Sequence, residues 1–125
     1  MNKVIYTDKA PAAIGPYSQA ILAGNTLYVS GQLPVNPATG NIDAEDIAGQ
    51  ARQSLTTIKH ILEEAGFTLN DVVKTTCLLH DVNDFAGFNA VYAEFFNENK
   101  PARACFGGND LPKGALIEIE VIAVK

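Results

Sequence analysis

The sequence predicts an α+β fold, a mixed sheet of about six strands with two helices packed on one face. Apolar residues alternate with period two near both ends of the chain and in its middle, two other segments have the helical period, and a strand segment follows each helical one. At 125 residues the chain is long enough for one core and too short for two. We therefore expect a single domain spanning residues 1–125.

The N-terminal third predicts a short strand followed by a β-hairpin. The first strand is expected at residues 4–7. Residues 18–23 and 26–30 flank Gly24-Asn25, and a two-residue connection of this type favours a tight hairpin because both residues tolerate positive φ. The turn-forming segment 31–34 is expected to end the second arm.

A long amphipathic helix is predicted from about residue 44 to residue 65. Its apolar residues recur at spacings of three and four, as one buried face of a helix requires: Ile47, Ala51, Leu55, Ile58, Leu62 and Ala65. Asp43 is the expected N-cap. Gly66 suits the position after the last turn, where a left-handed residue commonly ends a helix.

A strand and a second helix follow. Between Asp71 and His80, apolar and β-branched residues alternate, with Val73, Thr75, Cys77 and Leu79 on one side. The second helix carries an aromatic stripe at helical spacing: Phe85, Phe88, Tyr92, Phe95 and Phe96. We interpret this stripe as core rather than as a cofactor site. The polar side chains of 81–84 can cap its first turn, and Pro101 prevents its continuation.

Two further strand segments at the C-terminal end carry charged side chains among apolar ones. Successive side chains of a strand point to opposite faces, so Arg103 and Cys105 share a face of the first segment, and Glu118 and Glu120 share a face of the second. Two helices can cover only one face of the sheet. The apolar residues left on the other face, Ile122 among them, imply a partner, most simply a symmetric homo-oligomer.

Composition and motif content exclude several classes of function. The formal net charge of −5 argues against a nucleic-acid partner, because such binding depends on neutralising phosphates with Lys and Arg. Cys77 and the second cysteine form no C-x-x-C pair, and no metal-ligand set surrounds His60 or His80. We expect a surface position for His60, a hydrogen-bonded turn position for His80, and neither metal nor cofactor. Without a signal sequence or membrane span, the sequence predicts a soluble, cytoplasmic protein.

Arg103 is the strongest candidate for a binding residue. Its planar guanidinium matches a carboxylate bidentately, and the flanking alanines leave room for a small acid. The alternative is an ordinary ion pair with Glu118 or Glu120, and those two carboxylates are equally compatible with a solvated edge strand. Cys105 is compatible with a nucleophile, but no histidine is placed to lower its pKa, which favours a small buried hydrophobe.

Five patterns occur in order along the chain. They are Ala-Ile-Gly-Pro-Tyr-Ser-Gln-Ala at 13–20, Tyr-Val-Ser-Gly-Gln at 28–32, Asn89-x-x-Tyr92-x-x-Phe95-Phe96, Pro101-Ala-Arg103-x-Cys105, and Leu111-Pro-x-Gly-Ala115-x-x-Glu118-Ile-Glu120. Together they resemble the Rid family (YjgF type) over the whole chain. The resemblance implies a cytosolic homotrimer of chorismate-mutase-like α+β subunits with clefts between subunits. It also implies hydrolysis of reactive imines and enamines such as 2-iminobutanoate and 2-aminoacrylate to 2-oxo acids, without a cofactor.

The same resemblance implies roles for three catalytic residues. Arg103 would bind the substrate carboxylate. Glu118 would activate the water that attacks the imine carbon, as a general base. Tyr17 would close the pocket and hydrogen-bond the substrate or the water.

Four other residues would form the substrate-binding lining. Ser30 and Gly31 would offer a hydroxyl and a backbone N–H. Cys105 would contribute backbone contacts beside the arginine, and Asn89 would lie near the pocket, mainly in support.

The sequence departs from the family pattern after Cys105. Relatives usually continue as a strand with alternating valines, whereas Phe106-Gly-Gly-Asn-Asp110 interrupts the strand here, and Ala104 replaces a common Ser or Thr.

Two other functions remain open at this point. One is a ribonuclease or translation inhibitor, which the net charge disfavours, and the other is a non-catalytic small-acid-binding or chaperone-like module.

Overall fold

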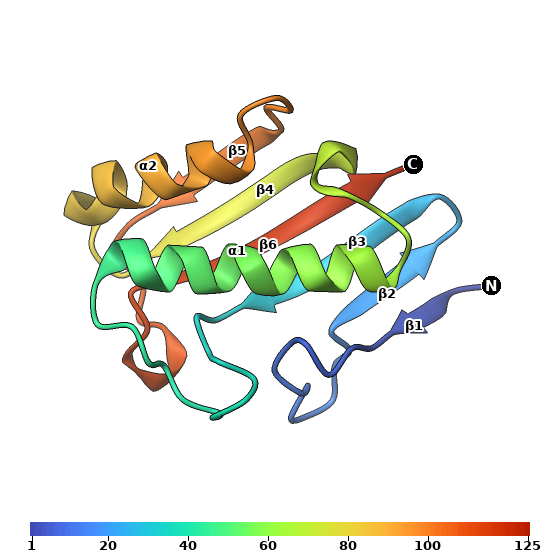
Figure 1. Ribbon diagram of the computed structural model, residues 1–125, viewed down its shortest axis with the longest axis horizontal. Helices are drawn as coiled ribbons and strands as arrows, with labels where there is room; N and C mark the ends of the chain where they lie inside the picture. Colours follow the sequence, from blue (N-terminus) through green and yellow to red (C-terminus); the bar gives the residue numbers. More distant parts are fainter.

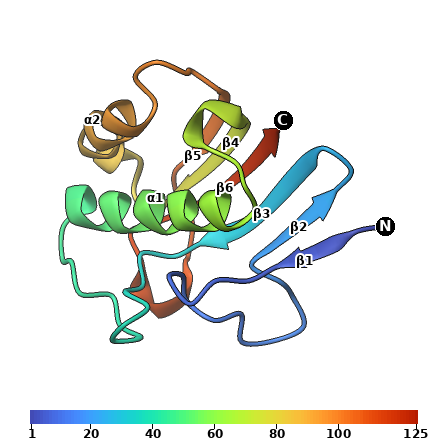
Figure 2. The same ribbon diagram turned by 45° about the vertical axis from the view of Figure 1, so that its right-hand side comes forward.

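The computed structural model describes residues 1–125 as one six-stranded sheet with two helices on the same face (Figures 1 and 2). The strands are β1 Lys3–Ile5, β2 Ala20–Ala23, β3 Thr26–Gln32, β4 Val72–Leu79, β5 Ala102–Phe106 and β6 Ile117–Val124, and the helices are α1 Ile47–Glu64 and α2 Phe85–Phe95. The sheet order is β1-β2-β3-β6-β4-β5. Only β4 and β5 pair in parallel, so the predicted mixed α+β fold is confirmed.

The predicted hairpin forms around Gly24-Asn25, with Gly24 at a φ of +61°. The flanking elements differ from the predicted ones. β1 begins at Lys3 and ends at Ile5, and β3 continues through Gly31 to Gln32 instead of ending before the turn. A register shift against β6 between Val29 and Gln32 lets the strand pass through this glycine.

Helix α1 begins three residues later than predicted, and its N-cap is Asp46 rather than Asp43. The Asp46 carboxylate accepts a hydrogen bond from the Gly49 N–H at 2.9 Å. Asp43 instead accepts from the Asn36 amide at 2.8 Å, within the preceding turn. Both aspartates satisfy the same sequence pattern, and this turn determines which one reaches the helix. Gly66 follows the last turn with a φ of +81°, as predicted.

A β-bulge changes the predicted alternation in β4. The register against β6 shifts between Val72 and Lys74, so that Val72 is buried while Val73 is exposed. The alternation is therefore wrong at Val73, although Thr75 and the following odd-numbered residues are buried as predicted. In front of α2, the Asp81 carboxylate caps a short 3-10 turn at Val82–Asp84 rather than the helix itself.

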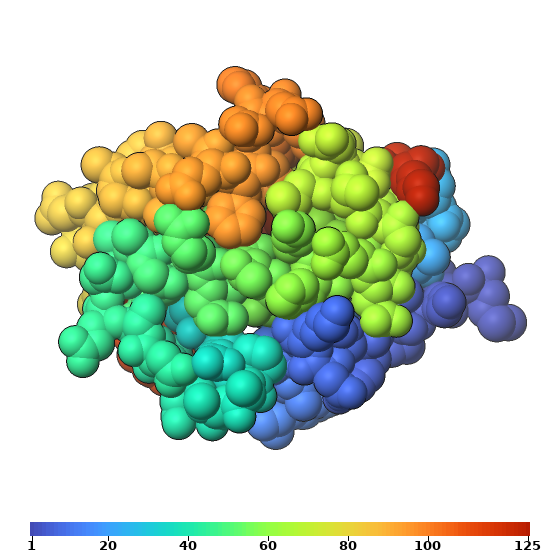
Figure 3. All heavy atoms as spheres, in the orientation of Figure 1, coloured from blue at the N-terminus to red at the C-terminus, as the bar shows by residue number.

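The core lies between the sheet and the two helices. Its fully buried members include Leu55, Ile58, Ile61 and Leu62 of α1 and Ile117, Ile119 and Ala123 of β6. Phe88, Tyr92 and Phe96 are also buried, which confirms three members of the aromatic stripe as core, whereas Phe85 is 36% exposed and Phe95 is only partly buried. Figure 3 shows the helix side, where α1 lies between α2 and the N-terminal loop.

The opposite face of the sheet carries exposed apolar side chains. Tyr28 is 50% exposed and Val124 is 37% exposed, and both belong to the two central antiparallel strands β3 and β6. Neither helix lies on this side (Figure 2). The predicted uncovered apolar face is therefore present in the single chain. No helix is long and apolar enough to cross a bilayer.

Candidate functional site

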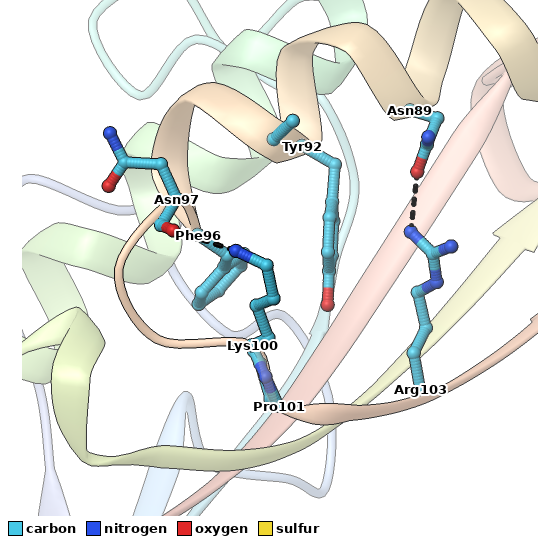
Figure 4. Close-up of a pocket in the computed structure, with 8 residues that line it drawn as sticks. Asn89, Tyr92, Phe96, Asn97, Lys100, Pro101 and Arg103 are labelled. Carbon is cyan, nitrogen blue, oxygen red and sulfur yellow. Dashed lines mark hydrogen bonds between the residues drawn. The ribbon is translucent and has the colours of Figure 1, made fainter.

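Arg103 lies on the helix-covered face, at the start of the edge strand β5. Its neighbour on β4 is Thr75, whose buried hydroxyl hydrogen-bonds the hydroxyl of Tyr92 on α2 at 2.8 Å. Residues paired across a sheet point to the same side, so Arg103 also points toward α2. One of its terminal nitrogens donates to the Asn89 side-chain oxygen at 2.7 Å (Figure 4). Its guanidinium carbon is 4.6 Å from the centre of the Tyr92 ring and 5.3 Å from that of Phe85.

The guanidinium has no carboxylate partner within the chain. The one ion pair in the structure joins Arg52 to Glu94, so the alternative in which Arg103 pairs with Glu118 or Glu120 does not occur here. Arginine has five N–H donors, and the Asn89 contact uses one of them. Asn89 and the aromatic rings therefore orient a fork whose remaining donors are free for an anion.

A pocket of about 570 Å³ opens beside Arg103, between the C-terminal half of α2 and the start of β5. The residues that line it are Asn89, Tyr92, Ala93, Phe96, Asn97, Lys100, Pro101 and Arg103. The lining contains two cationic side chains and no carboxylate. It is therefore suited to small anions, although the chain as a whole carries a net charge of −5.

Glu118 lies on the opposite face of the sheet. It pairs with Leu78 of β4, whose neighbours Cys77 and Leu79 are buried in the core on the helix side. The Glu118 carboxylate lies over Gly31, because a Cβ added to that glycine would be 2.9 Å from Oε2. Partial burial, followed by the charge of Glu120, raises the pKa of Glu118. A carboxylate with a raised pKa accepts a proton more readily, as a general base must.

One chain therefore does not bring Arg103 and Glu118 together. Arg103 and Cys105 share the helix-covered face, as predicted, while Glu118 and Glu120 share the open face. Burial raises the pKa of the Cys105 thiol and the Arg103 charge opposes this, which does not favour a thiolate nucleophile.

Tyr17 lies in the loop before β2, to which Ser30 of β3 is hydrogen-bonded, and a buried glutamine holds this loop in place. The Ser30 hydroxyl donates to the Ser18 carbonyl at 2.5 Å, and Tyr17 is 55% exposed. Gln19 is 3% exposed, accepts from the Thr7 N–H, and donates to backbone carbonyls of residues 7, 10 and 11. The sequence reasoning assigned no role to Gln19, although its place within the pattern at residues 13–20 was a signal for it.

The interruption after Cys105 is a turn over the end of β4. β5 ends at Phe106, and Gly107 approaches Val82 so closely that a Cβ on the glycine would be 2.6 Å from the Val82 Cβ.

His80 donates from Nδ1 to the Asn109 carbonyl at 3.0 Å, which confirms its predicted role in a turn. His60 lies at the surface, as predicted, and is partly buried there, with Nδ1 3.3 Å from the Lys9 carbonyl.

Comparisons with known proteins agree with this architecture. The family model described as Endoribonuclease L-PSP matches residues 7–125. A RutC family protein of Pyrococcus horikoshii is 58% identical over 125 residues, covering 100% of this chain and 99% of the relative. The 2-iminobutanoate/2-iminopropanoate deaminase of Escherichia coli K12 is 53% identical over 128 residues, with the same coverage. The structure of YyfA from Yersinia pestis, of the conserved Rid protein family, superimposes with a TM-score of 0.97 at 47% identity, covering 100% of both chains.

Proposed function

Because this chain belongs to the Rid (YjgF) family, whose model is described as Endoribonuclease L-PSP, we propose that it is a 2-iminobutanoate/2-iminopropanoate deaminase. It hydrolyses reactive 2-imino acids and their enamine forms, such as 2-aminoacrylate, to 2-oxo acids and ammonia. The relative from Escherichia coli that carries this name supports the choice among the family's mixed names.

The unpaired fork of Arg103 is the observation that carries the proposal. A small 2-imino acid has one permanent charge, its carboxylate, and a bidentate contact with Arg103 would fix the position of the adjacent imine carbon. Asn89 holds the fork in place from α2. Cys105 adds backbone contacts on the same strand.

Glu118 acts on the attacking water. The carboxylate removes a proton as the water oxygen bonds to the imine carbon, and returns it to the imine nitrogen, giving a neutral tetrahedral carbinolamine. It then takes the proton of the carbinolamine hydroxyl and passes it to the nitrogen as the C–N bond breaks, so that ammonia leaves and the carbonyl forms. Water and imine are consumed, 2-oxo acid and ammonia are released, and Glu118 is again a carboxylate.

The complete site requires two copies of the chain in a homotrimer. Arg103 and Glu118 lie on opposite faces of one sheet, and the face that carries Glu118 is apolar and uncovered. Packing that face against another copy buries it and lets Arg103 of one chain meet Glu118 of the next. Tyr17, Ser30 and Gly31 line the cleft on the Glu118 side.

Imine quenching tests the proposal directly. A dehydratase or amino-acid oxidase generates the imine, a nucleophile such as semicarbazide competes for it, and release of 2-oxo acid is followed with and without the protein. We expect Arg103→Ala and Glu118→Gln each to lower kcat/KM at least about a hundredfold, the usual scale for a positioned charge or base. Near wild-type activity of Arg103→Ala would refute the clamp, and an inactive wild type would refute the deaminase.

We prefer this function to RNA cleavage. The net negative charge of the chain and the carboxylates on the open face disfavour the binding of RNA, which is a polyanion. Retention of RNA that weakens steeply with added salt would reverse this preference. Tight binding of 2-oxobutanoate without turnover of any imine would instead indicate a small-acid-binding module.

A further inference from the structure

We propose that Lys100 forms a second anion-binding point in the Arg103 pocket, so that the protein accepts 2-imino dicarboxylates, those derived from aspartate or glutamate. The inference rests on the proposed function for the reaction, but its binding step does not depend on catalysis. It assigns a role to a residue outside the motifs by which the sequence resembles its family.

Lys100 and Arg103 extend from the same segment into one pocket. Figure 4 shows Arg103 directed from β5 toward α2 and Lys100, just before β5, directed toward Asn97 at the end of α2, with the Tyr92 ring between them. A fully extended chain advances about 3.3 Å per residue, so the two Cα atoms are at most about 10 Å apart. Two long side chains from these positions can converge on the two ends of a short diacid.

Neither cation is neutralised. The only ion pair of the chain lies elsewhere, and the pocket lining contains no Asp or Glu. The Lys100 amine donates to the Asn97 carbonyl at 2.9 Å, which leaves two of its three N–H groups free. Two cations that share a pocket without a counter-charge favour a ligand that carries two negative groups.

The pocket between the two cations suits a short carbon chain. Tyr92 and Phe96, which are 7% and 4% exposed, form apolar walls there, and Ala93 leaves space beside them. Its volume of about 570 Å³ is ample for a small diacid. Methylene groups between the carboxylates would contact these walls without unpaired polar groups.

The backbone beside Lys100 is anchored before any ligand binds. The Asn99 amide donates to the carbonyls of Leu69 at 3.0 Å and Val72 at 2.8 Å, which attaches this segment to the start of β4. A fixed backbone lowers the entropic cost of placing the amine on an anion.

A purely structural role for Lys100 makes a different prediction. The Asn97 carbonyl lies just after α2, and a lysine donating there stabilises the helix end. Lys100→Gln keeps a donor for that carbonyl and removes the charge, whereas Lys100→Arg keeps the charge. Lys9→Gln is the matched control, because Lys9 is exposed and lies outside the pocket.

Calorimetric titration with 2-oxoglutarate and 2-oxobutanoate, stable stand-ins for the diacid and the monoacid, tests the proposal. We expect Lys100→Gln to weaken 2-oxoglutarate binding about tenfold, as loss of one charge-assisted contact implies, and to leave 2-oxobutanoate binding unchanged. Lys100→Arg and Lys9→Gln should bind both acids as the wild type does.

Three results would overturn the inference. In the first, the wild type fails to bind 2-oxoglutarate; in the second, Lys100→Gln binds 2-oxoglutarate as tightly as the wild type does; in the third, Lys100→Gln weakens the binding of both acids by the same factor. Imine quenching with the glutamate-derived and alanine-derived imines separates this inference from the proposed function. If Lys100→Gln alters only 2-oxoglutarate binding while the wild type hydrolyses neither imine, the second anion point stands and the deaminase proposal fails. If both imines are hydrolysed equally well by wild type and Lys100→Gln, the second anion point fails alone.

Discussion

Glu118 occupies a position where a charge is costly, next to a second carboxylate on the same strand. Partial burial and the Glu120 charge together raise the pKa of its carboxyl group. Gly31 makes this position possible, since any side chain there would take the space of the carboxylate. The residue is therefore suited to accept a proton and is also a source of pH dependence.

Activity should fall as the pH drops through the raised pKa of Glu118, because the protonated acid cannot act as a base. Glu120→Gln removes the charge that contributes to the shift, so the acid limb of the kcat/KM profile should move to lower pH. Glu64→Gln, an equal change of charge at an exposed site on α1, should leave the profile in place. An unmoved acid limb in Glu120→Gln would contradict the assignment.

The raised pKa of Glu118 also makes the stability of the fold depend on pH. A carboxyl group whose pKa is raised by folding contributes stability below its unfolded pKa, and this contribution is lost as the pH rises through the folded value. Charged Glu118 therefore opposes folding at neutral pH. Thermal unfolding of Glu118→Gln should show a higher Tm than wild type near neutrality, and the difference should shrink in acid.

At the scale of the element, the start of α1 depends on a single hydrogen bond. Asp46→Ala leaves the Gly49 N–H without its partner, and we expect a loss of about 1 kcal/mol in the free energy of unfolding. Asp43→Ala is the matched control, with an expected loss below about 0.5 kcal/mol because its contacts lie in an exposed turn. Denaturant titration of both variants measures the difference, and a larger effect at Asp43 would be inconsistent with the observed cap.

The elements themselves were largely predictable because their patterns are local. Gly24-Asn25 determines the hairpin through its tolerance of positive φ, and the apolar spacing of α1 follows the helical period. The errors arise where a distant partner decides. The bulge that exposes Val73 exists only against β6, and no residue near Val73 indicates it.

At the scale of the molecule, the family resemblance predicted that Arg103 and Glu118 act in one site in a cleft between subunits, but not that the two residues lie on opposite faces of one sheet. Alternation shows which residues of one strand share a face, but not which face of the sheet that is. The faces follow from the order β6-β4-β5 and from the side on which α2 packs. Lys100 was missed because it lies outside any strand or motif, and only the folded pocket places it beside Arg103.

A site shared between chains predicts subunit complementation. We expect Arg103→Ala and Glu118→Gln each to be nearly inactive alone, yet random co-assembly in equal amounts should restore about a quarter of wild-type activity, since each site would need an intact residue from each of two chains. Co-assembly of Arg103→Ala with the double variant Arg103→Ala/Glu118→Gln should stay inactive. If the mixed assemblies recover nothing although they form, the two residues do not act across an interface.

β6 is the last strand in sequence order, yet it lies between β3 and β4 in the middle of the sheet (Figure 1). Before it is synthesised, the chain contains two separate groups of strands, β1-β2-β3 and β4-β5, each with an unpaired edge where β6 will lie. Such edges pair readily with other chains, and sheet pairings over long sequence separations form slowly. Protection of the nascent chain is therefore needed most in the interval before Ile117–Val124 emerges.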